Sequence, residues 1–327
     1  MNIEKALTLG YSEESQYAET IHPGPLADNS CQVKSPSKTA ISIRRYRLYT
    51  ISNTEPIKEF KLKLAVIQPR ASREFPEFTL TSLEGAVADS KLHDVDVVIL
   101  PELILPGYNF PKRHHSMAQS LNGEWMRNLS KIAQKYQCAI VLGWAERFEG
   151  TVYNSVTALG SRGEILAHYR KRQLFGAMEQ KSFAPGRSPS PVFEIAGYKF
   201  GLLICYEIEL PEYARDLALR GAEVVIVPTA NPVGYEHVQD ILVPARAYEN
   251  RQFVAYVNYC GAQNGLAFSG TSLVAGPDGK ALAQAGHEAT ALYVKLPEFS
   301  DYPKRILSTQ LDDLRKLTDQ SDVPHRE

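Results

Sequence analysis

The sequence predicts an α/β protein built from layers, and two observations support that class. Short apolar runs rich in Val and Ile recur from residue 62 onward, and such runs are typical of buried strands. Segments with helical spacing of apolar residues separate them, and alternating strands and helices favour helices packed on a sheet. The chain has 327 residues, of which 44% are hydrophobic, so it can form one large core or two small domains.

The predicted elements follow one another in a regular order. The expected strands cover residues 62–68, 94–100, 139–144, 154–159, 165–169, 200–205, 224–229, 253–259, 272–275 and 291–296. The expected helices cover residues 75–92, 120–136, 212–219 and 237–250. Periodicity alone does not distinguish one doubly wound sheet from stacked sheets, so the arrangement of the layers stays open at this point.

Residues 1–60 differ in composition from the rest of the chain. Residues 11–38 are rich in Ser, Glu, Pro and Asn with few large aliphatic side chains, which is typical of a loose leader. Residues 40–52 alternate roughly and are compatible with a strand. We therefore expect an N-terminal extension over residues 1–60, partly disordered or packed on a partner subunit, followed by one domain over 61–300 and a C-terminal tail over 301–327.

The charge balance and the cysteines exclude several classes of function. The 36 basic and 37 acidic side chains give a net charge of −1, so nothing indicates binding to nucleic acid or to an anionic membrane. No apolar stretch approaches the roughly 20 residues of a membrane span, and the N-terminus lacks the layout of a signal peptide. The scattered cysteines lack metal-binding spacing, and nucleotide-binding glycine patterns are absent. We expect a cytoplasmic protein with reduced thiols, no metal and no cofactor.

Cys205 ends an apolar run, Gly201-Leu-Leu-Ile-Cys205, and a helix-compatible segment begins after it at Pro211. A rigid strand that ends in a sharp turn presents a nucleophile well, and N–H groups of that turn and of the next helix can face an oxyanion. A cysteine at the end of a buried strand is also a common core residue. Two other segments favour the catalytic interpretation.

Glu102 and Lys171 lie in these two segments. Glu102 ends the apolar run Val97-Val-Ile-Leu-Pro-Glu102, where a carboxylate is costly unless it is paired or functional. Burial raises the pKa of a carboxyl, which suits a general base. Lys171 lies between two arginines, and three adjacent cations are also typical of a solvated face. The three residues are far apart in the sequence, so only the fold can assemble them.

Together these segments resemble the carbon–nitrogen hydrolases of the nitrilase superfamily. The resemblance rests on LPELILPGYN around Glu102, YRKRQLF around Lys171, LLICYEIELPEYAR around Cys205, and the block from Glu179 to Gly186. The stretches 227–232, 244–250 and 268–279 are also similar to the family, so the likeness covers roughly residues 62–297. It implies a four-layer αββα sandwich and at least a homodimer.

The resemblance also implies a Glu–Lys–Cys triad. Cys205 would attack an amide or nitrile carbon, while Glu102 would take the thiol proton, pass it to the leaving ammonia and later activate water. Lys171 would lower the thiol pKa and, with the backbone N–H of Tyr206, stabilise the oxyanion. Glu179 would position the substrate or the lysine; the alternative is that Glu179 is a surface glutamate.

Glu209 bears on the choice of substrate. The run from Cys205 to Glu212 is similar to the branch of aliphatic and amino-acid amidases, which includes 5-aminopentanamidase and stereoselective amidases. A glutamate here removes an anchor for a substrate carboxylate and supplies one for an ammonium group, with Glu207 and Glu212 nearby. The alternative is that these glutamates face solvent or cap the next helix. Tyr108 and Asn231 are further candidates for substrate binding.

Two other features receive a structural interpretation. His114 and His115 have no partner at metal-ligand spacing, so we expect a solvated loop there, within a basic stretch from Pro111 to Ser120 that helps to shape the pocket. Arg246 and Glu249 are three residues apart on a predicted helix, which is typical of a surface ion pair.

The sequence thus predicts an amidase that converts a small aliphatic or amino-acid carboxamide into a carboxylate and ammonia. Hydrolysis of an N-carbamoyl amine or amino acid and hydrolysis of a nitrile are the alternative reactions. A catalytically idle family member that serves as a scaffold is the alternative outside enzymes. A Ser–His–Asp hydrolase is disfavoured because no G-x-S-x-G motif occurs.

Overall fold

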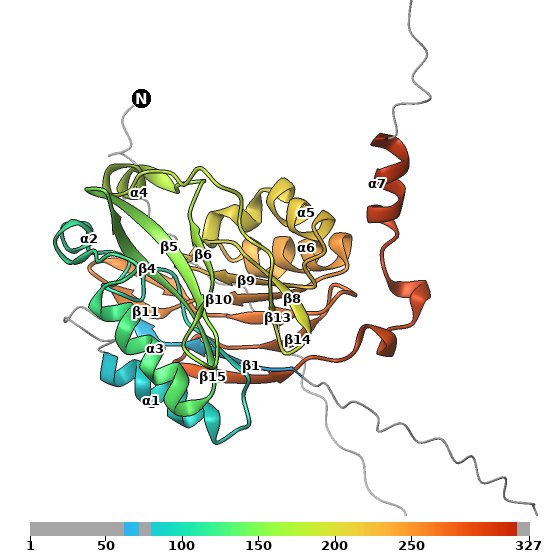
Figure 1. Ribbon diagram of the computed structural model, residues 1–327. Coiled ribbons are helices and arrows are strands. Elements are labelled where there is room, and N and C mark those ends of the chain that lie inside the picture. Colours follow the sequence, from blue (N-terminus) through green and yellow to red (C-terminus); the bar gives the residue numbers. More distant parts are fainter. Residues whose placement is uncertain (1–61, 72–79, 319–327) are drawn as a thin grey trace, which may run out of the picture. The chain divides into compact units, whose positions relative to one another are not determined.

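The computed structural model describes residues 62–71 and 80–318. The predicted leader at 11–38 and the strand-compatible segment at 40–52 lie outside these residues. Two six-stranded sheets and a small three-stranded sheet form the framework (Figure 1).

The first sheet has the order β15-β1-β3-β4-β5-β6. Its strands are β1 (Lys63–Gln68), β3 (Val97–Ile99), β4 (Ala139–Phe148), β5 (Thr151–Leu159), β6 (Ile165–Arg170) and β15 (Thr290–Lys295). The central strands β1, β3 and β4 are parallel, whereas β15, β5 and β6 join in antiparallel fashion. Because β5 reverses the direction once, β6 again runs the same way as β4.

The second sheet has the order β14-β13-β10-β9-β8-β7, with β8, β9 and β10 parallel. Its strands are β7 (Phe193–Ile195), β8 (Tyr198–Leu202), β9 (Val224–Pro228), β10 (Phe253–Val257), β13 (Leu273–Ala275) and β14 (Ala281–Gln284). The small sheet joins β2 (Arg70–Ala71), β11 (Cys260–Gln263) and β12 (Leu266–Ser269).

The sheets and helices form four layers, and a hydrophobic core lies between each pair of adjacent layers. One core lies between the two large sheets, and a second packs α1 (Leu80–Lys91) and α3 (Glu124–Tyr136) on the outer face of the first sheet. The third packs α5 (Pro211–Leu219) and α6 (Val243–Asn250) on the outer face of the second sheet. The predicted αββα sandwich is therefore confirmed.

Strand β1 shows why periodicity left the layers open. Leu64 and Val66 face the core between the sheets, whereas Ala65 and Ile67 face the core under α1 and α3. Strands buried on both faces read as continuous apolar runs, so the sequence located the strands without indicating which layer covers each face.

Several predicted boundaries differ from the structure. The strand expected at 94–100 spans 97–99, the strand expected at 200–205 ends at 202, and the helix expected at 120–136 begins at 124. The helix expected at 237–250 is a π-helical turn, Val238–Leu242, followed by α6. The unpredicted helices are α2 (Pro111–Met117), α4 (Gly176–Ser182) and α7 (Gln310–Thr318), the last within the predicted tail.

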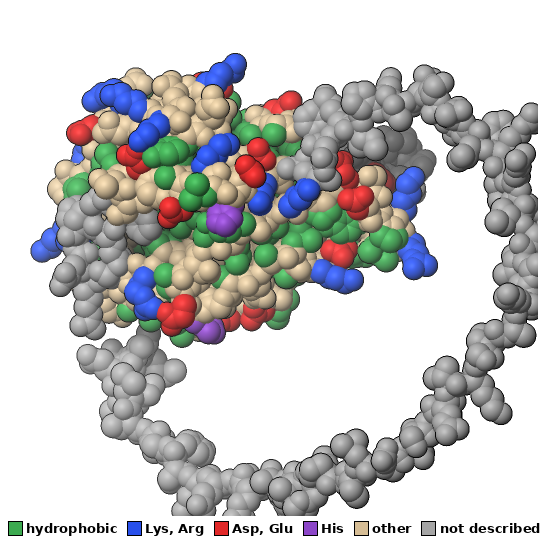
Figure 2. All heavy atoms as spheres, turned by 90° about the horizontal axis from the view of Figure 1, so that it is seen from below, with side chains coloured by type: hydrophobic (Ala, Val, Ile, Leu, Met, Phe, Trp, Pro, Cys, Tyr) green, Lys and Arg blue, Asp and Glu red, His purple; other side chains and the backbone are tan. Residues whose placement is uncertain are grey.

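The surface carries charges of both signs. On the face shown in Figure 2, basic and acidic side chains are interspersed over the described part of the molecule. Among residues 62–71 and 80–318, no helix has the length and apolar character that a membrane crossing requires.

Candidate active site

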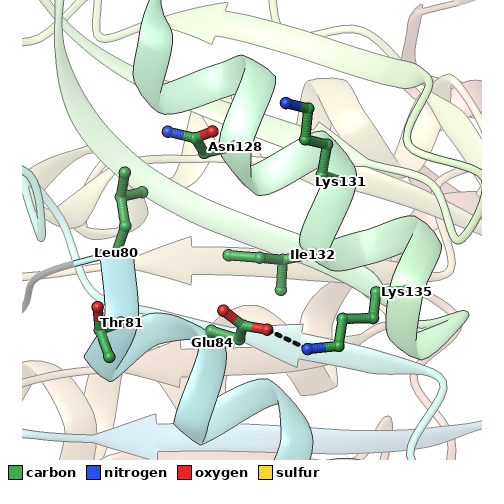
Figure 3. A pocket seen from close by; sticks show the side chains of 7 residues that line it. All are labelled: Leu80, Thr81, Glu84, Asn128, Lys131, Ile132 and Lys135. Atoms are coloured by element: carbon green, nitrogen blue, oxygen red, sulfur yellow. Dashed lines mark hydrogen bonds and ion pairs between the residues drawn. The ribbon is translucent and has the colours of Figure 1, made fainter.

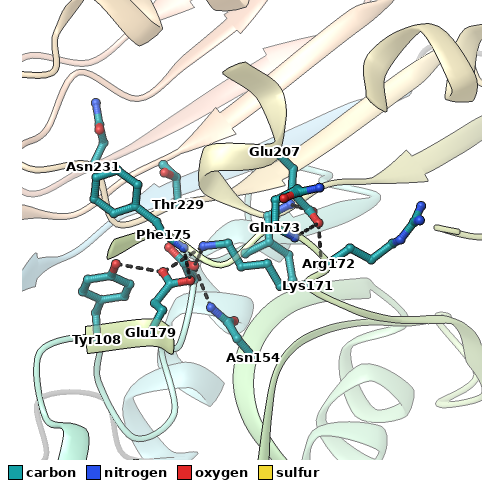
Figure 4. A network of polar contacts seen from close by, with 12 residues as sticks. Tyr108, Asn154, Lys171, Arg172, Gln173, Phe175, Glu179, Glu207, Thr229 and Asn231 are labelled. Atoms are coloured by element: carbon teal, nitrogen blue, oxygen red, sulfur yellow. Dashed lines mark hydrogen bonds and ion pairs between the residues drawn. The ribbon is translucent and has the colours of Figure 1, made fainter. Parts of the chain in front are cut away.

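The strand ends bring the predicted catalytic residues together. Glu102 follows β3 and Lys171 follows β6 in the first sheet, whereas Cys205 follows β8 in the second. Lys171 Nζ donates to Glu179 Oε1 at 2.8 Å (Figure 4) and to Glu102 Oε1 at 2.7 Å. All three side chains are fully buried. The solvated-face interpretation of Lys171 is therefore wrong.

Glu102 is held by one of its oxygens and leaves the other available. Oε1 accepts from Lys171 and, at 2.7 Å, from Asn154 Nδ2, whereas Oε2 has no hydrogen-bond partner in the described structure. Burial raises the pKa of Glu102 to about 7, helped by the charge of Glu179 and opposed by Lys171 and Asn154. This carboxyl can therefore exchange a proton near neutral pH.

Lys171 remains an ammonium despite its burial. Burial alone would lower its pKa, but the carboxylates of Glu102 and Glu179 raise it above the ordinary value. Lys171 N also donates to Asn154 O at 2.8 Å, which continues the pairing of β6 with β5 to this residue. A fixed cation at this place suits the stabilisation of a developing oxyanion.

Glu179 is the second carboxylate that holds the lysine. It lies on α4, fully buried, so the surface alternative is wrong. Its Oε1 accepts from Tyr108 Oη at 2.8 Å and its Oε2 accepts from Phe175 N at 3.0 Å. Glu179 thereby connects Tyr108, in the segment after Glu102, with Phe175, in the segment after Lys171.

Cys205 begins a short 3₁₀ helix, Cys205–Glu209, after β8 ends. Its backbone has φ of 49°, a left-handed conformation that is strained for a residue with a side chain and frequent at functional sites. Burial raises the pKa of the thiol, as do the charges of Glu102 and Glu179, whereas Lys171 lowers it. The thiol is therefore protonated at rest and needs a base to accept its proton.

Arg246 corrects the prediction of a surface ion pair. Its side chain is buried on α6, where Nε donates to Ile208 O at 3.1 Å and Nη2 donates to Glu209 O at 2.8 Å. Nη1 also pairs with Glu249 at 3.2 Å. Because these carbonyls lie in the 3₁₀ helix that begins at Cys205, Arg246 supports the turn that carries Cys205.

The candidate substrate-binding residues lie in different surroundings. Glu209 is half-buried, and burial raises its pKa. By contrast, Glu212 is exposed on α5, and Glu207 is fully enclosed, so neither is placed as an ammonium anchor. Asn231 Nδ2 donates to Tyr235 O at 3.0 Å and to Gln239 Oε1 at 2.8 Å, which gives Asn231 a role in holding its own loop.

Aromatic rings surround the segments that carry Lys171 and Cys205. The ring of Phe175 lies 5.4 Å from that of Tyr206 and 5.8 Å from that of Tyr235, between centroids. Tyr235 in turn lies 6.1 Å from His237. The Phe175–Tyr235 pair is edge-on and the other two pairs are tilted, and aromatic rings carry a negative π face.

His114 corrects the prediction of a solvated loop. It is fully buried on α2, with Nε2 3.0 Å from Gly107 O and its ring 4.7 Å from that of Phe183. Burial lowers the pKa of His114 to about 4, so the imidazole is neutral at physiological pH. It supports the turn before Tyr108.

A separate pocket of about 250 Å³ lies between α1 and α3 (Figure 3). Its lining consists of Leu80, Thr81, Glu84, Asn128, Lys131, Ile132 and Lys135. Lys135 Nζ pairs with Glu84 Oε1 at 2.6 Å, and the lining contains no cysteine or histidine. Within residues 62–71 and 80–318, no three His, Cys, Asp or Glu side chains gather closely enough to hold a metal ion.

Comparison with known proteins identifies a family that matches most of this chain. Residues 63–299 match the carbon–nitrogen hydrolase family. The (R)-stereoselective amidase of a Pseudomonas species is 38% identical over 236 residues, covering 72% of this chain and 85% of that protein. The 2-oxoglutaramate amidase of Bacillus subtilis is 33% identical over 258 residues, covering 78% of this chain and 98% of that protein.

Solved structures agree with the sequence comparison. A mutant of the amidase from Nesterenkonia sp. AN1 carries the acetamide moiety of fluoroacetamide covalently at its active-site cysteine. It resembles this chain with a TM-score of 0.71 at 32% identity, covering 79% of this chain and 96% of that chain. Another mutant of the same amidase is described as a member of the nitrilase superfamily. This chain therefore belongs to the carbon–nitrogen hydrolase family of the nitrilase superfamily.

Proposed function

We propose that this protein is an amidase that hydrolyses a small aliphatic or amino-acid carboxamide through an acyl-enzyme on Cys205. The observation that carries the proposal is the buried pair of Glu102 and Lys171, in which Glu102 Oε2 lacks a partner within the described structure. A carboxylate with an available oxygen and a pKa of about 7 can accept and return a proton at neutral pH. The covalently modified cysteine of the Nesterenkonia amidase supports the same nucleophile.

In the first half of the reaction, Glu102 accepts the thiol proton of Cys205 while sulfur forms a bond to the amide carbon. The electron pair of the carbonyl moves to its oxygen, where Lys171 and the backbone N–H of Tyr206 stabilise the negative charge. When the oxyanion collapses, the carbon–nitrogen bond breaks and Glu102 returns the proton to the leaving nitrogen. Ammonia departs and a thioester remains.

In the second half, the oxygen of a water molecule attacks the thioester carbon while Glu102 accepts a proton from that water. Collapse of this second oxyanion breaks the carbon–sulfur bond, and Glu102 returns the proton to the sulfur of Cys205. The free acid then loses its own proton to solvent, so the products are a carboxylate and ammonia. Glu179 contributes by holding the Lys171 ammonium in place.

The preferred substrate in this proposal carries a positive amine. Glu209 is half-buried at the end of the 3₁₀ helix that also carries Tyr206. The ring of Tyr206 lies 5.4 Å from that of Phe175, which lies 5.8 Å from that of Tyr235. A carboxylate and aromatic faces both attract an ammonium group. Assembly into a homo-oligomer and a cytoplasmic location stay predictions.

Ammonia release from a panel of amides, nitriles and N-carbamoyl compounds tests the proposal, with Cys205→Ala as the inactive control. We expect rapid release from a cationic amino-amide and a specific loss of that preference in Glu209→Gln. Carbon dioxide released together with ammonia would favour the carbamoyl reaction. Equal rates on cationic, neutral and acidic amides would contradict the role of Glu209. If no compound of the panel releases ammonia and Cys205 also resists alkylation, the result would favour a catalytically idle scaffold.

A further inference from the structure

Glu207 is a buried carboxylate that the reaction above does not use. It lies two residues after Cys205 and is fully enclosed. Its Oε2 accepts from Ile204 N at 2.9 Å, immediately before the nucleophile. Its Oε1 accepts from Tyr169 Oη at 2.7 Å, from Arg172 N at 2.7 Å and from Gln173 N at 3.3 Å (Figure 4).

The four partners define which chemical group fits this place. Three are backbone N–H groups and the fourth is a phenol, so every one of them donates to Glu207. An ionised carboxylate accepts on both oxygens, whereas an amide of the same shape would turn two N–H groups toward donors. Such a buried mismatch is costly, so this arrangement selects a carboxylate rather than any polar side chain.

These contacts join the two segments that carry the nucleophile and the lysine. Ile204 and Cys205 follow β8 of the second sheet, whereas Tyr169 is the second-last residue of β6 in the first sheet and Arg172 lies just after that strand. The nucleophile and the ammonium thus stand on different sheets, and Glu207 bonds to the backbone on either side. The distance between sulfur and ammonium then depends on Glu207 as well as on the apolar core.

We infer that Glu207 is a positioning residue that sets the place of the Cys205 thiol relative to the Lys171 ammonium. The inference rests on the proposed function, because it assumes that these two groups act on the same substrate carbonyl. A displacement of about 1 Å at reacting groups can cost roughly 10²-fold in rate. The role of Glu207 is therefore visible in turnover rather than in substrate affinity.

Glu207→Gln and Tyr169→Phe test the inference, with Glu146→Gln as the matched control. Glu146 is also a buried carboxylate that accepts from several donors, but its partners are Ser155, His168 and Arg170. We expect Glu207→Gln to lower kcat by about 10²-fold with KM nearly unchanged, and to slow alkylation of Cys205 by iodoacetamide. Tyr169→Phe keeps the carboxylate and should lower kcat about threefold to tenfold. Glu146→Gln should lower Tm while kcat and alkylation keep their wild-type values.

A purely structural role predicts a different pattern. Glu207→Gln would then resemble Glu146→Gln, with a lower Tm and wild-type kcat and alkylation in the folded protein, and the inference would be overturned. If Glu207→Gln does not fold, unchanged kcat and alkylation in Tyr169→Phe would overturn it equally. If it folds, the effect of Tyr169→Phe should vanish in the double mutant, because both act through one contact.

Alkylation separates this inference from the amidase proposal. A wild-type protein that releases no ammonia but reacts with iodoacetamide at Cys205 would refute the proposed reaction. The dependence of the alkylation rate on Glu207 and Tyr169 would still decide whether Glu207 positions the thiol.

Discussion

Glu102 and Glu146 are two buried carboxylates held by neighbouring residues of the same strands, yet their surroundings differ in kind. Glu102 bonds to Asn154 and Lys171, whereas Glu146 bonds to the adjacent Ser155 and Arg170. Successive side chains of a strand point to opposite faces. Asn154 and Lys171 therefore hold Glu102 on the face toward the second sheet, whereas Ser155 and Arg170 hold Glu146 on the opposite face.

The two carboxyls differ in how completely they are satisfied. Both oxygens of Glu146 are bonded, and although burial would raise its pKa, the hydrogen bonds of Arg170 and His168 lower it to about 2. Glu102 keeps one oxygen without a partner in the described structure, and its pKa is about 7. A fully bonded buried charge is structural, whereas a partly bonded one is ready to exchange a proton.

The largest expected difference concerns the carboxylates themselves. Glu102→Gln removes the group that accepts the thiol proton, so we expect kcat to fall roughly 10²–10⁴-fold with a native circular dichroism spectrum. Glu146→Gln should leave kcat within a few-fold of wild type and lower the free energy of unfolding by about 1–3 kcal/mol, because donors of Arg170 and His168 lose an acceptor. Steady-state ammonia release and denaturant unfolding measure both. Equal losses of activity in the two variants would contradict the distinction between a catalytic Glu102 and a structural Glu146.

The next difference concerns two adjacent cations. Lys171→Met removes the donor to the oxyanion and should lower kcat roughly 10²–10³-fold. Arg170→Met keeps the strand but removes the partner of Glu146, so its effect should appear in Tm and hardly in kcat. A mutant of Lys171 with full turnover would exclude it from the oxyanion site.

Activity and stability should depend on pH in different ways through Glu102 and Glu146. Because Glu102 must be ionised to accept a proton, kcat/KM should fall about tenfold per unit below pH 7 and level off above it. For stability the raised pKa of Glu102 and the lowered pKa of Glu146 act oppositely. The contribution of Glu146 is present above about pH 4.5 and is lost as pH falls toward 2, whereas that of Glu102 is lost as pH rises from about 4.5 to 7.

Denaturant unfolding of the wild type and both glutamine variants across pH 2–8 checks these signs. Glu102→Gln should reduce the loss of stability between pH 4.5 and 7, and Glu146→Gln should reduce the loss below pH 4.5. The same slope in both variants would show that the two carboxyls do not differ as described.

Sequence reasoning found the residues at strand ends, and Glu179 beside Lys171, but it missed other residues that support them. Glu102 and Cys205 each follow an apolar run, and that pattern survives in a single sequence. The seven-residue α2 (Pro111–Met117) begins with Pro-Lys-Arg-His-His and shows no apolar stripe, so the periodicity that reveals longer helices is absent.

His114 and Arg246 were misjudged for a related reason. Both bond to backbone carbonyls, and those of Arg246 belong to residues 37 and 38 positions away in the sequence. Backbone acceptors leave no trace in side-chain spacing, so a buried arginine on a helix looks like one end of a surface pair. Only the hydrogen bonds of Arg246 to the carbonyls of Ile208 and Glu209 separate the two cases.

The smallest expected effect belongs to Arg246, a structural charge that lies next to the reacting groups. Arg246→Lys keeps the charge but loses the fork that bonds the carbonyls of Ile208 and Glu209, since a lysine offers a single ammonium. We expect kcat to fall less than about tenfold, because Glu207 still holds the start of the same turn. Arg215→Lys is the control, since Arg215 on α5 also donates to a backbone carbonyl, that of Glu249 on α6, at 3.2 Å. If kcat falls in Arg246→Lys and not in Arg215→Lys at similar Tm, support of the nucleophile's turn extends to the outer helix layer. Equal changes of kcat and Tm in the two variants would show that Arg246 does not support the turn, and that the turn is held only by contacts between the two sheets.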